Sequence, residues 1–266
     1  MSVPESPEMR AMLNDFATRC FRDVADSDYI LARMALRARL VPQFLWSSLQ
    51  AVEKYLKAIL LYNRTPSAQA THGVSGLLAK VENIAALRLQ ISASTREFVE
   101  YLDMYGKFRY LEVSYHGGGL KLVSLDRAVW DIRRYCTVLN YSLTKRDGTS
   151  IPMLERELRC IEESEKNLRF KWFEGEIERI AANRKHPARP GLIWNNLYFG
   201  ARKRRAVRVV DWFSSVNSPL ALHPGLFAEV RKYVFLPKEM IREFEKVMAK
   251  HAARERIRNS SYDRVL

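Results

Sequence analysis

The stretch PQFLWSSLQAVEKYLKAILLY, residues 42–62, repeats its apolar side chains every three or four positions. The repeating residues are Leu45, Leu49, Val52, Leu56, Ile59 and Leu60. This spacing aligns them on one face of an α-helix of about five turns. Pro42 suits a first helical turn, where its missing N–H is not needed, and Asn63–Pro66 supplies the turn residues that end the helix. The core is therefore predicted to form around an amphipathic helix.

Helical periodicity continues on both sides of this stretch. Ser27 can cap a helix over about 28–39, and the short link to Pro42 makes the two helices antiparallel neighbours. Further helices are expected at 72–81, at 95–108 and, capped by Ser124, at 124–139. The sequence thus predicts an all-α fold whose N-terminal part consists of several consecutive helices.

Three consecutive glycines, residues 117–119, interrupt the helical pattern. They separate the helix expected over 95–108 from the one expected over 124–139. Because glycine destabilises a helix interior, His116 is expected at a helix end or on a loop.

The polar segment 145–150 is the predicted domain boundary, because it holds Asp147 and Gly148 between two periodic regions. The predicted domains are a helical bundle over residues 1–147 and a basic, mainly helical region over residues 148–266. The second region should contain a charged amphipathic helix over about 153–184 and a last helix over about 238–257. The β-branched Val207, Val209 and Val210 leave short strands open between 192 and 210.

The chain is strongly basic, with 44 Lys and Arg against 30 Asp and Glu and a net charge of +14. Residues 1–147 carry +5 of this excess and residues 148–266 carry +9. Such an excess favours an acidic partner such as nucleic acid, although charge also serves solubility alone. The 47% hydrophobic content excludes a disordered chain.

The cysteines and the apolar runs bear on the compartment. Cys20, Cys136 and Cys160 are odd in number, far apart and not at metal-ligand spacing, which indicates reduced thiols in a cytoplasmic protein. No apolar run approaches the roughly 20 residues of a membrane span, so no membrane partner is expected. No metal or other cofactor is predicted.

Four features in chain order carry a resemblance to a known family. They are Asp28-Tyr29 in the first helix, Gln50-Ala51-Val52-Glu53-Lys54-Tyr55-Leu56-Lys57-Ala58 in the second, His72 with Val74, Leu77 and Leu78 in the third, and Arg109-Tyr110 before the last helix. Together they resemble the HEPN family over roughly residues 15–143. The resemblance implies an all-α bundle of four to five helices that commonly dimerises.

The same resemblance implies two kinds of function. Some HEPN members are metal-independent endoribonucleases that act as toxins or defence effectors, and these use an Arg followed, after four to six residues, by a His. Arg109 and His116 have six residues between them. Other members bind RNA or nucleotides, or partner a small nucleotidyltransferase, without cutting, and Arg109-Tyr110 also matches the Arg-Tyr pair of members that lack the histidine.

Both residue types suit RNA cleavage without a metal. An imidazole can take the proton of the 2′-hydroxyl or give one to the leaving 5′-oxygen, and a guanidinium stabilises negative charge on the phosphate. His116 is thus the predicted acid or base and Arg109 the predicted cation. In the resemblance, two protomers place their pairs together at a dimer groove. Arg179 and His186 have the same spacing but lie outside the part that resembles the family.

A basic cluster follows an aromatic segment in the second region. The cluster comprises Arg202, Lys203, Arg204, Arg205 and Arg208, and the aromatic residues before it are Trp194, Tyr198 and Phe199. Aromatic faces beside cations can stack bases and hold phosphates, so these cations are the predicted RNA-binding residues. The alternative is that the aromatic residues are core and the cations form a solvated turn.

The sequence therefore leads to a HEPN-like protein that acts on RNA, with a metal-independent endoribonuclease of toxin or defence type as the enzyme hypothesis. The alternative is a non-catalytic RNA- or nucleotide-binding module that partners a nucleotidyltransferase. The expected partners are RNA, a second copy of the chain bound through the helical bundle, and a nucleotidyltransferase or an antitoxin. A helical scaffold without any nucleic-acid role is the third hypothesis.

Overall fold

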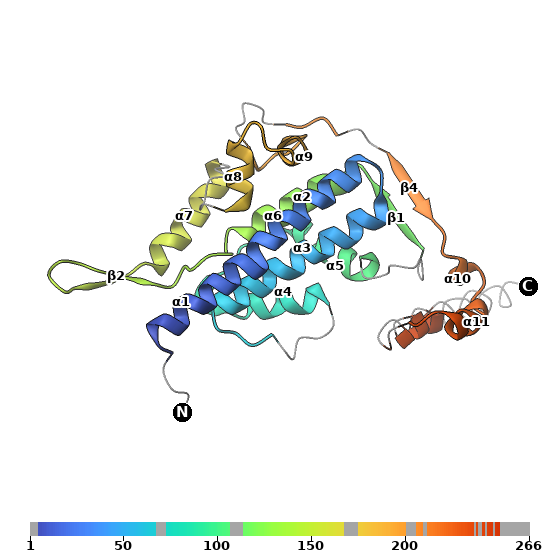
Figure 1. The fold of residues 1–266 in the computed structure, drawn as a ribbon, viewed down its shortest axis with the longest axis horizontal. Helices are drawn as coiled ribbons and strands as arrows, with labels where there is room; N and C mark the ends of the chain where they lie inside the picture. The colour runs from blue at the N-terminus through green and yellow to red at the C-terminus, as the bar shows by residue number, and fades with distance from the viewer. Residues whose placement is uncertain are drawn as a thin grey trace, which may run out of the picture. The chain divides into compact units, whose positions relative to one another are not determined.

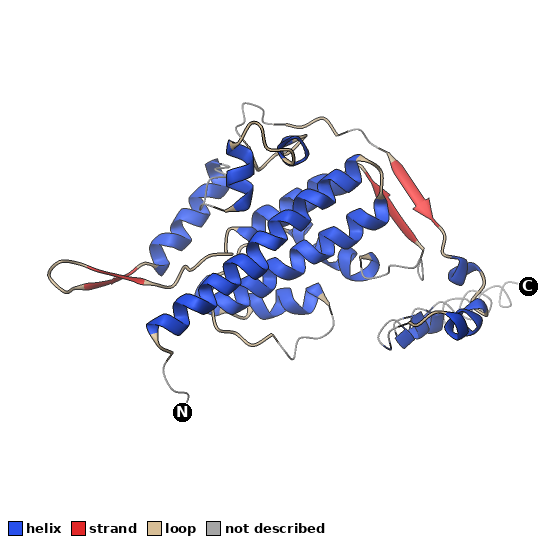
Figure 2. Ribbon diagram, viewed as in Figure 1, coloured by secondary structure: helices blue, strands red, loops and turns tan. Residues whose placement is uncertain are grey.

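A computed structural model describes residues 5–67, 73–106, 114–167, 175–200, 206–209, 212–236, 238, 241–242, 244–246 and 248–250. Helices dominate these residues, and the described strands form two small two-stranded sheets (Figure 2). The predicted all-α class is confirmed. The chain divides into two compact units, Met1–Lys107 with Gly119–Trp212 and Phe108–Gly118 with Phe213–Leu266. We call the first the bundle unit and the second the hairpin unit.

The bundle unit begins with one long α-helix that is interrupted by a single π-helical turn. Its parts are α1 (Pro7–Phe16), the π-helical turn η1 (Ala17–Arg22) and α2 (Asp23–Arg37). Ser6 caps this helix, since its hydroxyl accepts the N–H of Met9 at 3.1 Å. The prediction that Ser27 is a cap was wrong: Ser27 lies inside α2 and donates to the carbonyl of Asp23 at 3.3 Å. An effective cap upstream starts the helix well before Ser27.

The helix predicted from the apolar repeat of 42–62 is α3 (Val41–Tyr62), and it is confirmed. The six residues of the predicted apolar face are all buried, and Leu49 is the most exposed of them at 7%. α2 and α3 lie side by side and run antiparallel, joined by a short turn (Figure 1). The apolar face of α3 thus forms the centre of the bundle core.

Three further helices complete the bundle: α4 (Val74–Glu82), α5 (Ala93–Tyr105) and α6 (Lys121–Arg133). His72, which was expected to open α4, lies outside the described residues. α6 begins before Ser124, so this serine is not its cap, and α6 ends before Leu139. The start of α6 is held instead by a tertiary hydrogen bond, in which the N–H of Gly119 donates to the carbonyl of Trp212 at 3.1 Å.

The chain after α6 packs back onto the bundle. It forms the hairpin of β2 (Ser142–Thr144) and β3 (Ser150–Pro152), and then α7 (Leu154–Asn167), α8 (Glu176–Ala182) and α9 (Arg189–Ile193). The single helix predicted over 153–184 is therefore two helices among the described residues. The boundary expected at 147 falls in the turn of the β2–β3 hairpin, whereas the compact units divide the chain elsewhere.

Buried polar contacts explain why 148–212 joins the bundle unit. Arg133 of α6 pairs with Glu178 of α8 at 2.8 Å, and both side chains are buried. The amide of Asn196 donates to the hydroxyl of Tyr29 at 2.8 Å inside the protein. These buried polar groups would lose their hydrogen-bond partners if residues 148–212 separated from the bundle. The segment is therefore part of the core of the bundle unit.

Two of the three aromatic residues before the basic cluster are core residues. Tyr198 is 9% exposed and Phe199 is 3% exposed. Trp130 of α6 stacks on Tyr198 with 5.5 Å between ring centroids and meets Phe199 edge-on at 5.8 Å. Trp194 is partly buried. The core alternative therefore holds for Tyr198 and Phe199, whose rings cannot stack on bases.

The hairpin unit contains the predicted histidine. Its elements are β1 (Tyr115–Gly118), β4 (Phe213–Val216), α10 (Pro219–Leu222) and α11 (Leu226–Tyr233). The part of this unit that follows β4 has a small core, made of Leu220, Phe227, Leu236 and Phe244. The described residues between 241 and 250 are helical, in agreement with the last predicted helix.

His116 lies on a strand, which corrects the prediction of a helix end or a loop. β1 pairs antiparallel with β4, and Tyr115 opposes Val216 at one end of the pair. The glycines extend rather than break the chain here, because β4 supplies hydrogen-bond partners for their backbone. The described residues of 192–210 contain no strand, and the β-structure of this part of the chain begins at Phe213.

Candidate functional site

His116 is partly buried on β1 and opposes Ser215 of β4. Its ring stacks on Phe213, with 5.9 Å between the ring centroids and 26° between the ring planes. Side chains alternate between the two faces of a strand, so His116, Phe213 and Ser215 share one face of the β1–β4 pair. Phe213 and Ser215 are exposed, whereas Ser214 and Val216 on the other face are partly buried. The imidazole therefore stands on the solvent-facing side of the hairpin.

Of the predicted site residues, the structure places His116 and Arg208. Arg109, the second member of the predicted catalytic pair, lies outside the described residues. The same is true of four members of the predicted RNA-binding cluster, Arg202, Lys203, Arg204 and Arg205. What the structure brings to His116 is Phe213, which the sequence did not single out.

The second Arg–His pair of the same spacing makes local contacts. Arg179 forms an ion pair with Glu176 on the same helix, α8. Nδ1 of His186 accepts the backbone N–H of Ala188 at 3.2 Å, which stabilises the turn before α9. His186 thus has a structural role in the bundle unit, since its Nδ1 holds a backbone donor.

Besides Arg208, two cations that the sequence did not indicate contact the tryptophans on either side of the basic cluster in the chain. Arg208 is exposed, and its carbonyl accepts the side-chain amide of Asn195 at 2.8 Å. Arg37, at the end of α2, lies over the ring of Trp194 at 5.2 Å. Arg39 lies over the ring of Trp212 at 5.7 Å. Both contacts join residues far apart in the chain, and no short-range sequence pattern signals them.

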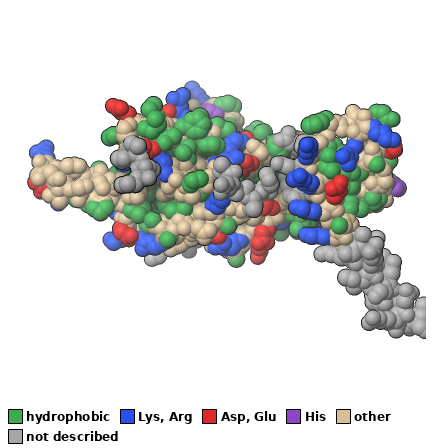
Figure 3. Space-filling view, turned by 90° about the horizontal axis from the view of Figure 1, so that it is seen from below, with side chains coloured by type: hydrophobic (Ala, Val, Ile, Leu, Met, Phe, Trp, Pro, Cys, Tyr) green, Lys and Arg blue, Asp and Glu red, His purple; other side chains and the backbone are tan. Residues whose placement is uncertain are grey.

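The positive charge is spread over the chain rather than gathered in one unit. The bundle unit has 33 Lys and Arg against 23 Asp and Glu, and the hairpin unit has 11 against 7. Figure 3 shows Lys and Arg side chains at several separate places on the viewed face, with acidic side chains among them. The charge therefore favours anionic partners in general and does not locate a single docking site.

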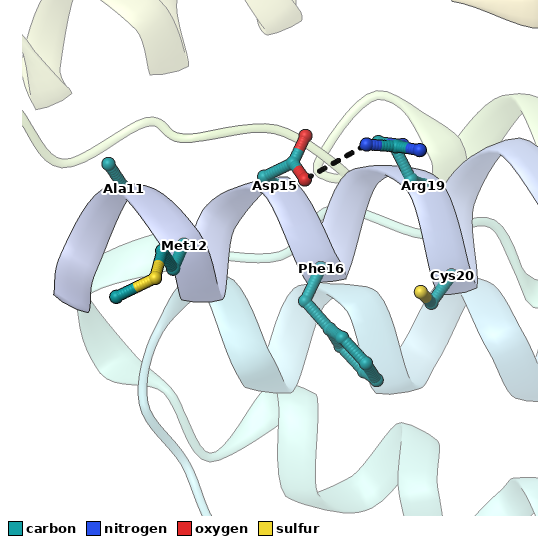
Figure 4. A pocket seen from close by; sticks show the side chains of 6 residues that line it. All are labelled: Ala11, Met12, Asp15, Phe16, Arg19 and Cys20. Atoms are coloured by element: carbon teal, nitrogen blue, oxygen red, sulfur yellow. Dashed lines mark ion pairs between the residues drawn. The ribbon is translucent and has the colours of Figure 1, made fainter. Parts of the chain in front are cut away.

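A shallow pocket lies on the first helix of the bundle unit. Figure 4 shows the side chains that line it, Ala11, Met12, Asp15, Phe16, Arg19 and Cys20. Asp15 and Arg19 form an exposed ion pair at 3.5 Å. Met12 is 58% exposed and Phe16 is 50% exposed, and these two side chains of the lining form an apolar stripe on α1. This composition suits a protein contact better than a reaction.

The most perturbed tyrosines lie in the sealed core. Burial raises the pKa of Tyr29 and of Tyr55 well above the usual 10.0, and a neighbouring carboxylate adds to each shift. The hydroxyl of Tyr29 donates to Asp126 at 2.7 Å, and that of Tyr55 donates to Asp26 at 2.6 Å. These hydroxyls are fully buried, so they serve the packing of the bundle and not a substrate.

The cysteines differ in accessibility. Cys20 is exposed, Cys160 is partly buried and Cys136 is buried, where desolvation raises the pKa of its thiol. Within the described part of the chain, no three His, Cys, Asp or Glu residues are grouped so that they could hold a metal ion. None of the described helices combines the length and the apolar character that crossing a membrane requires.

Comparison with known proteins identifies the bundle. The HEPN domain family model matches residues 19–137, which extend from the π-helical turn η1 to just beyond α6. No curated protein and no solved structure matches the chain. The matched range contains Arg109 and His116 and excludes Arg179, His186 and Arg208. Residues 19–137 of this chain are therefore a HEPN domain.

Proposed function

We propose that this protein acts on RNA in the cytoplasm as a metal-independent endoribonuclease of toxin or defence type. His116 is its acid or base and Arg109 its phosphate-stabilising cation. One observation carries the proposal: the Arg–His pair at the family's spacing falls inside the HEPN match, and its histidine stands on a solvent-facing strand. The basic charge of both units supports an anionic substrate.

The proposed chemistry needs no group beyond the chain. The imidazole of His116 takes the proton of the 2′-hydroxyl, whose oxygen attacks the adjacent phosphorus, or it protonates the 5′-oxygen that leaves. The guanidinium of Arg109 donates hydrogen bonds to the phosphate oxygens as negative charge builds on them. The products are a 2′,3′-cyclic phosphate and a free 5′-hydroxyl.

The second Arg–His pair, Arg179 and His186, supports His116 as the catalytic histidine by comparison. His186 uses Nδ1 to hold the N–H of Ala188, and Arg179 is engaged by Glu176. This pair also lies beyond the HEPN match, so it does not have the position of the family's catalytic pair. A substitution of His186 therefore provides the matched control for the RNA cleavage assay.

We also propose that the protein works as a homodimer through its helical bundle. The apolar stripe on α1 supports this, because Met12 and Phe16 expose half or more of their area. Large apolar side chains that line a pocket on one helix favour burial against a partner. The mass of the purified protein in solution, measured by light scattering, tests the dimer directly.

The test of the nuclease is cleavage of a mixed-sequence RNA in the presence of EDTA. We expect the wild type to cut and His116→Ala and Arg109→Ala each to lose at least 100-fold in rate, the scale of one acid–base group. His186→Ala should cut at the wild-type rate. Thermal unfolding of each variant verifies that the fold is kept.

Two results would contradict the nuclease proposal. One is cleavage that persists in His116→Ala, and the other is RNA binding without cleavage by the wild type. The second outcome supports the non-catalytic hypothesis, in which Arg109-Tyr110 marks a binding module that partners a nucleotidyltransferase. RNA retention should then weaken steeply with salt and fall when Arg202, Lys203, Arg204 and Arg205 are neutralised.

A further inference from the structure

The exposed face of the β1–β4 pair carries an aromatic ring beside the proposed catalytic histidine. Phe213 is 73% exposed, although its ring stacks on His116. The contact with His116 therefore leaves most of the area of this residue exposed to solvent. An apolar ring of this size gains free energy when a partner covers it.

Glycine leaves room for a partner at this place. Phe213 opposes Gly118 in the strand pair, so no side chain from β1 stands across from it. His116 and Ser215 follow on the same face. Glycine in a strand often marks a place where a ligand approaches the backbone closely. The face therefore presents the aromatic ring of Phe213, a position without a side chain at Gly118, and the imidazole of His116. We call the ring of Phe213 the aromatic platform.

The charge of the hairpin unit favours an anionic partner, and the exposed ring favours one that has unpaired bases. None of the eight residues of β1 and β4 is an Asp or a Glu. The hairpin unit as a whole carries 11 Lys and Arg against 7 Asp and Glu. An anionic backbone is thus attracted to the unit, and an exposed aromatic ring can stack on any unpaired base.

We propose that Phe213 stacks on a base of single-stranded RNA and so positions the strand against His116. The inference rests on the proposed function, because it takes RNA as the ligand. It adds a binding residue that requires unpaired bases, since the bases of a duplex are stacked on each other and cannot reach the ring. A nucleotide on Phe213 lies beside the imidazole, because the two rings are themselves in contact.

The test measures binding separately from cleavage. The probe is a fluorescent single-stranded RNA with 2′-O-methyl groups, which cannot be cut because the attacking hydroxyl is blocked. We expect Phe213→Ala to weaken binding roughly 5- to 100-fold, the effect of removing one base–aromatic stack. Phe213→Tyr should restore binding, because it keeps the ring, and Phe213→Leu should not, because it keeps only the apolar volume.

Controls separate local stacking from general effects. Phe235, in the same unit, is 89% exposed, and Phe235→Ala should bind the probe like the wild type. With cleavable RNA, Phe213→Ala should raise KM more than it lowers kcat. The wild type and Phe213→Ala should bind an RNA duplex of the same sequence with equal affinity.

Three outcomes would overturn the inference. They are unchanged binding by Phe213→Ala, an equal loss in Phe235→Ala, and a shift of Phe213→Ala from dimer to monomer, which would assign the ring to a second copy of the chain. If the wild type cuts no RNA but Phe213→Ala loses binding, the platform stands and the nuclease proposal fails. If cleavage depends on His116 but not on Phe213, the platform alone fails.

Discussion

At the scale of single residues, Arg133 decides how the parts of the bundle unit join. Its guanidinium contacts both oxygens of Asp26 at 2.6 and 2.8 Å and both oxygens of Glu178 at 2.8 Å. Burial opposes the charge of Arg133, but Asp26 and Glu178 outweigh it and raise the pKa of the guanidinium. One cation therefore pairs with two buried carboxylates, one from α2 and one from α8.

Arg133→Met should strongly destabilise the protein. It leaves Asp26 and Glu178 buried without their cation, and breaking a buried pair in this way costs about 3–5 kcal/mol of unfolding free energy. Arg156→Met, on the exposed side of α7, is the control and should change stability little. Urea unfolding of both variants gives the comparison. Equal stability of the two would show that Arg133 does not hold the junction.

Phe213 could not be identified as a site residue from the sequence alone. A phenylalanine among serines gives no periodic signal, and its partner His116 lies almost a hundred positions earlier in the chain. Only the register of β1 against β4 brings the two rings to the same face. His116 itself was found through the spacing of a family motif.

At the scale of elements, α4 is capped from another helix. Both oxygens of Asp103 on α5 accept backbone N–H groups at the start of α4, from Val74 at 2.8 Å and from Ser75 at 2.9 Å. Gly73 fits beside this carboxylate, because a Cβ there would come within 2.7 Å of its oxygen. A negative charge at a helix N-terminus also stabilises the helix dipole.

Asp103→Ala should lower the unfolding free energy by about 1–2 kcal/mol, because two backbone donors of α4 lose their acceptor. Glu100→Ala on the same helix is the control, since Glu100 is exposed. Thermal unfolding monitored by circular dichroism measures both variants. A melting temperature of Asp103→Ala equal to that of Glu100→Ala would contradict the capping role.

At the scale of the molecule, the chain beyond α6 belongs to the fold of the HEPN bundle. The bundle unit includes residues up to Trp212, whereas the HEPN match ends at residue 137. Glu178, Asn196, Tyr198 and Phe199 all contact bundle residues in the core. The region that the sequence treated as an extension therefore completes the core of the domain before it.

A chain cut at the predicted boundary should not fold stably. Residues 1–147 lack Glu178 and Asn196, and Trp130 loses the rings of Tyr198 and Phe199 that cover it. A chain of residues 1–200 keeps these contacts and should unfold cooperatively on heating. Circular dichroism and limited proteolysis of the two chains give the test. Cooperative unfolding of 1–147 at the temperature of 1–200 would show that the bundle is complete without α8 and α9.

The sequence by itself determined the helical class, the place of α3 and the kinship with HEPN proteins. These rest on features within short segments, such as the apolar repeat of 42–62 and the motif residues of 50–58. It failed at Ser27 and Ser124, since a serine can cap a helix only where the chain actually begins one. Helix ends depend on contacts from outside the helix.

Only the tertiary structure decided what surrounds the candidate site and what completes the core. The pairing of β1 with β4 places Phe213 beside His116, and the salt bridge of Arg133 with Glu178 attaches α8 to the bundle. These contacts join residues that are far apart in the chain. No local pattern specifies them, because the free energy of such pairs is gained only when the whole chain has folded around them.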